Sequence, residues 1–305
     1  MMKTLLTSLS IYFLCLGLQA QSIEFVKDSL MDKYMKSGFA SKHFVPLGNY
    51  DEEGKRTGMW KDYFNWYFYA NIMKEDLPVK VYGSFLLYGE GIYKGGERDS
   101  IWTVYTIEDK TFNKFLHSKT RFKDGTPQGP GLLYYPDGSL AEKGTFLEGL
   151  FEGPLTRYYP DGKVFADIKF ESGKWVGTHT YRYPDGGIKL QQSFIEDKNH
   201  GNYISYYRNG QLKCKTFYKL GEYHGKYSYY YENGQLWVER IYKNGLLLEV
   251  NGNYTSTGEE QDKGTLKNGT GTVKFYSEEG KLYLIHTYKE GKLESKEELG
   301  KASFD

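Results

Sequence analysis

Cysteine is nearly absent from this 305-residue sequence, which contains only Cys15 and Cys214. Cys15 lies in an apolar N-terminal stretch, so the rest of the chain has one thiol and cannot form an internal disulfide. Cys214 occupies a strand position that other copies of a repeat fill with small or aliphatic residues. That environment favours a packed side chain over a reactive thiol. Cysteine usage therefore predicts no disulfide framework and does not identify the redox compartment.

An excess of charge of either sign is also absent, because 40 basic residues face 39 acidic ones. The first twenty residues contain Lys3 and no acidic residue, so removing them leaves 39 of each sign. A nucleic-acid-binding protein needs a basic surface to displace counterions. A polybasic membrane anchor needs clustered positive charge as well. The charge balance argues against both classes of protein.

Beyond the first twenty residues, no apolar run is long enough to span a bilayer. Residues 4–18 are apolar or small, follow the positive charge of Lys3, and precede a small residue at Ala20. This pattern predicts an export signal that is cleaved before Gln21. An uncleaved anchor, a buried N-terminal helix and lipidation at Cys15 are the alternatives. The expected location is the periplasm, the cell envelope or the outside of the cell.

Known catalytic motifs are missing too: there is no nucleophile elbow, phosphate-binding glycine loop or zinc-protease helix motif. Asp and Glu occur in every repeat, so the sequence supplies the residue types from which a carboxylate pair for glycoside hydrolysis could be built. Catalysis needs one asymmetric cleft, however, and similar hairpins do not supply it. We therefore expect no catalytic or cofactor-binding residue, and a protein that is not an enzyme.

Metal binding is also not expected. The histidines are few: His43, His117, His179, His200, His224 and His286. Two of them, His200 and His224, share a repeat position and should lie about one hairpin (~10 Å) apart, too far to hold a metal without further ligands. An aspartate series could suggest a calcium ladder, but hairpin turn chemistry explains it better. Its members are Asp137, Asp161 and Asp185.

Tyrosine and glycine are abundant instead, with 30 and 36 residues. Tyrosine favours strands and glycine favours tight turns, so the composition predicts many short hairpins. A Pro-Asp-Gly or x-Asn-Gly signal recurs with a spacing of 24 residues. Its glycines are Gly138, Gly162, Gly186, Gly210 and Gly234, with weaker copies at Gly258 and Gly280. We expect each copy to be a strand, a turn that uses the positive φ of Asp-Gly or Asn-Gly, a second strand and a glycine-containing loop.

Other residues recur in step with the turns. A second glycine series precedes the turn glycines by nine residues: Gly129, Gly153, Gly177, Gly201 and Gly225. A row of aromatic residues lies eight positions after the turn glycines: Phe146, Phe170, Phe194, Tyr218 and Tyr242. Within one strand, Cys214 and Thr216 should share a face, while Lys215 and Phe217 point the other way. The predicted fold is all-β: an elongated solenoid of antiparallel hairpins forming one long twisted sheet.

The domain organisation follows from where the repeat is strong. Residues 122–294 hold about seven copies, and residues 48–121 hold degenerate copies with insertions. Residues 21–47 lack the repeat and form a small N-terminal cap, in which apolar residues have helical spacing. Residues 295–305 form a polar tail. Because a solenoid buries its apolar face only by stacking neighbours, single copies should not fold alone.

The repeat resembles the MORN repeat variant, in particular that of bacterial YwqK-type proteins, which are often described as antitoxin components. The resemblance is carried by the Y-Y-x-x-G-x-L segment at residues 206–212 and the Y-x-x-G-x-x-x-G segment at residues 218–225. It implies protein–protein contact, scaffolding or, in some members, contact with membrane lipid. An export signal would separate this chain from a cytosolic toxin.

Two adjacent tyrosine rows are candidates for ladders that hold the sheet together or for an exposed strip that binds a partner. The second row comprises Tyr134, Tyr158, Tyr206, Tyr230, Tyr254 and Tyr276. The first row, which we take as the candidate partner-binding strip and name the tyrosine row, comprises Tyr135, Tyr159, Tyr183, Tyr207 and Tyr231. The leading hypothesis is an extracytoplasmic protein-binding scaffold. The alternatives are a cell-surface glycan or lipid binder, an antitoxin or immunity component, and an enzyme hidden in residues 65–100.

Overall fold

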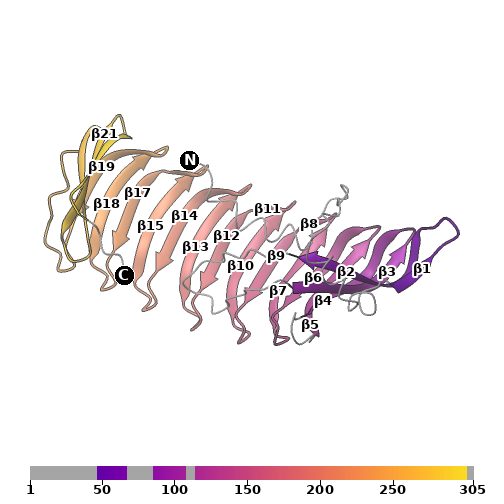
Figure 1. Cartoon of the computed structure of the whole chain (residues 1–305). Coiled ribbons are helices and arrows are strands. Elements are labelled where there is room, and N and C mark those ends of the chain that lie inside the picture. The colour runs from indigo at the N-terminus through magenta and orange to yellow at the C-terminus, as the bar shows by residue number, and fades with distance from the viewer. Residues whose placement is uncertain (1–46, 67–84, 108–113, 301–305) are drawn as a thin grey trace. The chain divides into compact units, whose positions relative to one another are not determined.

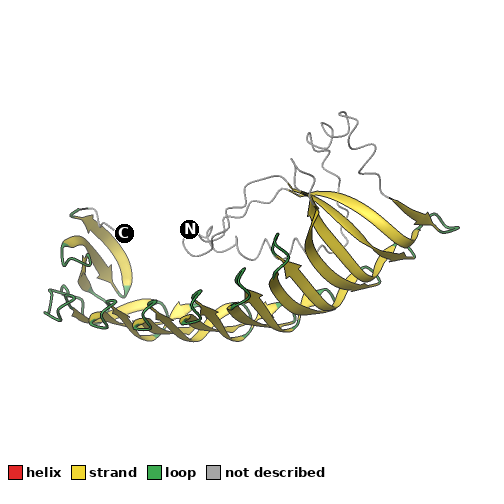
Figure 2. Cartoon of the chain, turned by 90° about the horizontal axis from the view of Figure 1, so that it is seen from below, coloured by secondary structure: helices red, strands yellow, loops and turns green. Residues whose placement is uncertain are grey.

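A computed structural model describes residues 47–66, 85–107 and 114–300. The expected signal segment, all but the last residue of the expected cap, and residues 301–305 of the expected tail lie outside the described residues. The chain divides into an N-terminal unit, residues 1–162, and a C-terminal unit, residues 163–305. The described parts of both units contain strands and connecting loops and no helix (Figure 2). The all-β class of repeated antiparallel hairpins is confirmed.

In the N-terminal unit, each strand from β1 to β7 pairs antiparallel with the next one along the chain, and β8 and β9 both pair with β7. The strands are β1 (Leu47–Tyr50), β2 (Arg56–Trp66), β3 (Phe85–Lys94), β4 (Glu97–Ile107), β5 (Lys114–Lys123), β6 (Thr126–Tyr134), β7 (Leu140–Leu147), β8 (Leu150–Phe151) and β9 (Gly153–Tyr158). The degenerate copies expected before residue 122 therefore fold as paired strands.

The C-terminal unit repeats the same pattern up to β19 and then ends in a separate three-stranded sheet, β20–β22 (Figure 1). Its strands are β10 (Val164–Glu171), β11 (Lys174–Trp175), β12 (Gly177–Arg182), β13 (Ile188–Ile195), β14 (Lys198–Tyr206), β15 (Leu212–Lys219), β16 (Glu222–Tyr223), β17 (Gly225–Tyr230), β18 (Leu236–Lys243), β19 (Leu246–Asn253), β20 (Gly271–Tyr276), β21 (Leu282–Lys289) and β22 (Lys292–Glu298). Strand β22 includes Ser295–Glu298, so part of the expected tail is ordered as an edge strand.

The two kinds of turn differ from the expectation in their backbone geometry. At the Pro-Asp-Gly and x-Asn-Gly turns only the glycine has a positive φ, as at Gly138 with 88°. The Asp137 carboxylate instead accepts the N–H of Ser139 at 2.8 Å, which is the Asx-type bond that favours Asp in turns. Two consecutive positive φ values occur in the other loop, as at Leu220 (51°) and Gly221 (94°). That loop is therefore the two-residue hairpin turn of type I′.

The expected alternation along a strand is confirmed in β15. Cys214 and Thr216 are buried, while Lys215 and Phe217 are exposed. The regular pairing is interrupted between Leu212 and Cys214, because Tyr206 pairs with Leu212 while Ser205 pairs with Cys214. This register shift is a β-bulge, which adds a residue to one strand and redirects its side chain.

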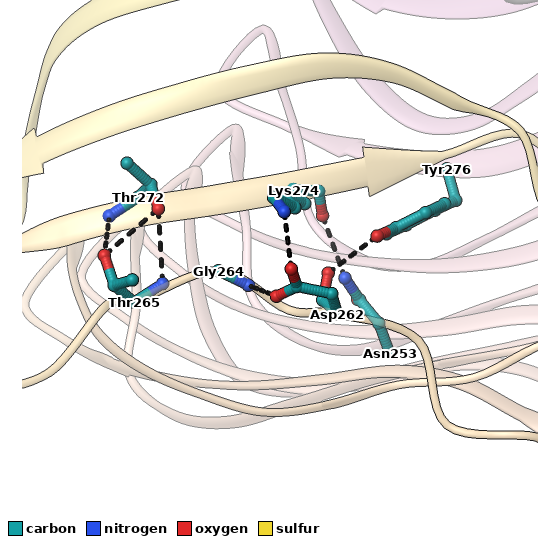
Figure 3. Close-up of polar contacts among 7 residues, drawn as sticks. All are labelled: Asn253, Asp262, Gly264, Thr265, Thr272, Lys274 and Tyr276. Atoms are coloured by element: carbon teal, nitrogen blue, oxygen red, sulfur yellow. Dashed lines mark hydrogen bonds and ion pairs between the residues drawn. The ribbon is translucent and has the colours of Figure 1, made fainter.

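Residues of β19 and of the β20–β22 sheet pack together at the end of the C-terminal unit. Leu247 and Val250 of β19 form a buried cluster with Leu266 and Val273. Polar contacts fix the connection that precedes β20 (Figure 3). Lys274 donates to the Asp262 carboxylate, and Asn253 Nδ2 donates to the Lys274 carbonyl at 2.8 Å. Packing against β19 limits the pairing of that end of the repeat sheet with another chain.

Candidate functional surface

The tyrosine row lies at the start of the Pro-Asp-Gly and x-Asn-Gly turns. Its rings are buried at Tyr159 and Tyr231 and partly buried in the other members. Four hydroxyls donate to the backbone carbonyl of the residue 23 positions later, at 2.6–2.9 Å. These donors are Tyr135, Tyr183, Tyr207 and Tyr231. These four tyrosines therefore tie their copies to the next, and contact of the row with a partner stays a prediction.

The rings of this row are also covered by neighbouring side chains. The Lys189 ammonium lies 5.6 Å from the Tyr183 ring centre, and the Lys213 ammonium lies 5.1 Å from that of Tyr207. In the next copy, Trp237 stacks on Tyr231 with ring centres 4.6 Å apart. Such cation–π and stacking contacts stabilise the turn. They also reduce the ring area that a partner could reach.

A different group of tyrosines gathers on one face of the C-terminal unit. These five rings are all partly exposed and contact one another with ring centres 4.7–6.2 Å apart. We name this group the tyrosine patch; it comprises Tyr203, Tyr218, Tyr223, Tyr227 and Tyr242. The rings come from β14, β15, β16, β17 and β18. The hairpin ladder thus brings together residues that are up to 39 positions apart.

The tyrosine patch lies against small buried side chains, among them Cys214 and Thr216. Beneath it, Cys214 is only 6% exposed, and burial raises the pKa of its thiol to about 11. The thiol is therefore protonated at neutral pH and behaves as a packing residue. Burial also raises the pKa of the hydroxyls of Tyr203, Tyr218 and Tyr227. These hydroxyls stay neutral donors, which suits a surface that makes hydrogen bonds.

Neither histidines nor carboxylates assemble into a metal site in the part of the chain that the structure describes. His200 and His224 lie on either side of Phe217, with ring centres 6.2 and 6.5 Å from that ring. Their Nδ1 atoms are hydrogen-bonded to the Leu220 N–H and to the Asn244 side chain. His179 is buried against the rings of Trp175 and Phe194. His43 lies outside the described residues.

Some residues of the tyrosine patch follow the repeat spacing in the sequence, and others do not. Tyr218 and Tyr242 belong to the aromatic row found eight residues after the turn glycines. Tyr203 and Tyr227 are also 24 residues apart, but other copies have Gly131, Leu155 or His179 at this position. The signal was therefore present in two copies only. Tyr223 joins the patch through ring contacts that a spacing argument does not show.

Comparison with known families identifies the repeat. The family model described as the MORN repeat variant matches residues 127–148, 199–220, 223–244 and 270–290. Each matched stretch corresponds to one hairpin: β6–β7, β14–β15, β17–β18 and β20–β21. No curated protein matches the chain. Among the described residues there is no helix long and apolar enough to cross a membrane.

Proposed function

Because the chain carries MORN repeat variants, we propose that it is a non-enzymatic, exported scaffold that binds a protein partner through the tyrosine patch. MORN repeats often mediate protein or membrane interactions. The observation that carries the proposal is the cluster of five contacting, partly exposed tyrosine rings on one face of the C-terminal unit. Tyrosine is enriched in protein interfaces because its ring packs while its hydroxyl forms hydrogen bonds.

The patch fits a binding role better than the tyrosine row does. Hydroxyls of the row are used by backbone carbonyls of the next copy, as in Tyr207 to Tyr230. Rings of the patch contact one another, and Tyr242 also packs against the buried cluster around Leu247. Export is supported by the signal pattern of the first twenty residues.

Site-specific photo-crosslinking in the native cell tests the binding role. A photoreactive residue at Tyr223 should give a discrete protein adduct, whereas one at Lys215, on the opposite face of the sheet, should not. Replacing Tyr227 and Tyr242 by serine should remove the adduct, with far-UV circular dichroism confirming an unchanged fold. An adduct that forms equally from both faces, or that survives the serine changes, would reject the patch as the binding surface.

The same experiment tests the alternative partner and the location. Adducts that contain carbohydrate or lipid and no protein would favour the glycan or lipid binder. N-terminal sequencing of the mature protein should begin at Gln21, and cell fractionation should find it outside the cytosol. A cytosolic protein that retains Met1 would reject export.

A further inference from the structure

Arg240 places a positive charge on the face of the sheet that carries the tyrosine patch. It lies in β18, directly opposite Tyr227 of β17 and Val250 of β19. Residues that are paired across strands point to the same face of a sheet. Earlier copies have a neutral residue at this position of the repeat: Gly144, Ile168, Gln192 and Thr216. The copy that holds Arg240 therefore adds a charge to the patch that the repeat itself does not require.

The guanidinium group lies where the tyrosine patch meets the β20–β22 sheet. Its Cζ atom is 4.6 Å from the centre of the Phe275 ring of β20. Phe275 in turn contacts His286 of β21, with ring centres 4.7 Å apart. On the side of the repeats, Tyr227 contacts Tyr242 with ring centres 6.2 Å apart. Aromatic residues of both sheets therefore lie around the guanidinium group.

Among the described residues, no carboxylate neutralises this group. The Nε–H of Arg240 is buried without a hydrogen-bond acceptor, and the side chain forms no ion pair in the same part of the chain. The adjacent Glu239 points to the opposite face, where it binds Lys226 at 2.8 Å. Glu298, on the β20–β22 sheet, binds Lys296 at 3.0 Å. A buried donor that lacks an acceptor costs stability, so an added acceptor would be favourable here.

The titratable groups around Arg240 stay neutral at pH 7. Burial, and then the charges of Arg240 and Lys296, lower the pKa of His286. Burial raises the pKa of the Tyr227 and Tyr288 hydroxyls, although Arg240 acts in the opposite direction. Protonated hydroxyls can donate hydrogen bonds. An anion at this place would therefore meet one guanidinium group and neutral donors.

We infer that Arg240 binds a carboxylate group of the protein partner that covers the tyrosine patch. A planar guanidinium group matches a carboxylate with two parallel N–H···O bonds. One guanidinium group also balances the single charge of a carboxylate, whereas a phosphate dianion needs a second cation and Lys296 is already paired. Contact with the Phe275 ring holds the guanidinium group in place. The inference rests on the proposed binding function and names the group that the partner contributes.

The test uses the full mature chain with ¹⁵N-labelled arginine and the peptide acetyl-Tyr-Glu-Tyr-amide as the probe. NMR follows the Nε–H signal of Arg240, which is assigned by its loss in Arg240→Gln. We expect a saturable shift of this signal as the peptide is added, because a carboxylate changes the hydrogen bonding of the guanidinium group. The matched peptide acetyl-Tyr-Gln-Tyr-amide should bind at least tenfold more weakly.

Variants separate the charge of Arg240 from its shape, with binding of the glutamate peptide measured by calorimetry. Arg240→Gln should weaken binding at least tenfold. Arg240→Lys keeps the charge without the planar fork and should weaken binding at least threefold. The matched control, Arg208→Gln, removes an exposed arginine that Asp185 already pairs at 3.1 Å, and should change binding less than twofold. Far-UV circular dichroism checks that each variant is folded.

Three results would overturn the inference: no saturable shift with the glutamate peptide, equal binding of the glutamate and glutamine peptides, or inorganic phosphate that binds through Arg240 more tightly than the glutamate peptide. Photo-crosslinking from Tyr223 separates these failures from failure of the proposed function. A protein adduct that persists at full yield in Arg240→Gln rejects only the carboxylate contact, whereas a missing adduct in the unaltered chain rejects the binding surface itself.

Discussion

The same repeat position is filled in different ways in different copies. In the N-terminal unit it holds Trp60 and Trp102, which are 2% and 1% exposed. In the C-terminal unit it holds His179 and Val273, which are buried, and Tyr203 and Tyr227, which are partly exposed. Both tryptophans make edge-to-face contacts with Tyr93, at ring-centre distances of 5.7 and 5.0 Å. The Trp60 and Trp102 copies thus have a closed aromatic core where the Tyr203 and Tyr227 copies have an open tyrosine patch.

The residue on the preceding strand differs between the tryptophan copies and the tyrosine copies. A Cβ atom on Gly48 or Gly91 would lie 2.2 or 2.5 Å from the indole of Trp60 or Trp102, so each indole lies flat over a glycine. Arginine side chains cover the other ring faces: Arg56 lies 4.6 Å from the Trp60 ring centre, and Arg98 lies 4.5 Å from that of Trp102.

In the C-terminal unit the glycine is replaced by Gln192 beside Tyr203 and by Thr216 in the next copy. Those side chains occupy the space over which a ring would lie, and the tyrosines remain partly exposed. Exposure of the ring is therefore set by its neighbour as well as by its own size.

The largest expected effect is the loss of a buried indole. Replacing Trp102 by alanine should cost about 3–5 kcal/mol of local stability, because a large side chain leaves a cavity in a packed core. Replacing Tyr227 by alanine should cost only about 1–2 kcal/mol, because less of its area is buried. Hydrogen exchange resolved by peptide measures each unit separately in one sample. Equal costs in both units would remove the contrast between core and patch.

Adding a methyl group to Gly91 sharpens the same contrast. Gly91 does not have a positive φ, so an alanine there tests space alone. We expect Gly91→Ala to cost about 1–3 kcal/mol, because overpacking displaces the Trp102 ring. The matched change in the C-terminal unit, Gln192→Ala, should have an effect below about 0.5 kcal/mol. If Gly91→Ala is neutral, the indole does not depend on the glycine.

A buried carboxylate makes the stability of the N-terminal unit depend on pH. Copies in the C-terminal unit have no carboxylate at the matching positions, Cys214 and Val238. Glu142 is 4% exposed and accepts a hydrogen bond from Arg157 at 2.8 Å, whereas Cys214 and Val238 occupy its position in later copies. Burial raises the pKa of Glu142 from 4.5 to about 7, although Arg157 acts in the opposite direction. The native state therefore favours the protonated form.

The sign of the effect follows from linkage. The protonated form stabilises the N-terminal unit fully below pH 4.5, and this contribution is lost as the pH rises to about 7. From pH 4.5 to pH 8, wild type should lose up to about 3 kcal/mol relative to Glu142→Gln. Exposed Glu148→Gln should not change the pH profile. Guanidinium unfolding across this range measures the difference, and parallel wild-type and Glu142→Gln profiles would contradict the assignment.

The predictable and unpredictable parts of the molecule have different physical origins. The period of 24 and the alternation in β15 follow from residue type, so the hairpins and their faces could be predicted. The positive φ of Leu220 could not, because leucine rarely adopts it; the glycine that follows and the strand ladder impose it. Burial of the Trp102 ring depends on Gly91, eleven residues earlier on another strand. Pairings of that kind become visible only when the register is known.

The smallest effect concerns the hydrogen bond by which a hydroxyl of the tyrosine row joins its copy to the next, which occurs within each unit. Tyr207→Phe removes one hydroxyl that donates to the Tyr230 carbonyl at 2.6 Å, which should cost about 1 kcal/mol. The adjacent Tyr206→Phe is the matched control, because its hydroxyl makes no such bond between copies. Exchange of the amides around Tyr230 should quicken in Tyr207→Phe alone. Should both variants behave alike, the tyrosine row would not be what ties the copies together, and its rings would again be available to a partner.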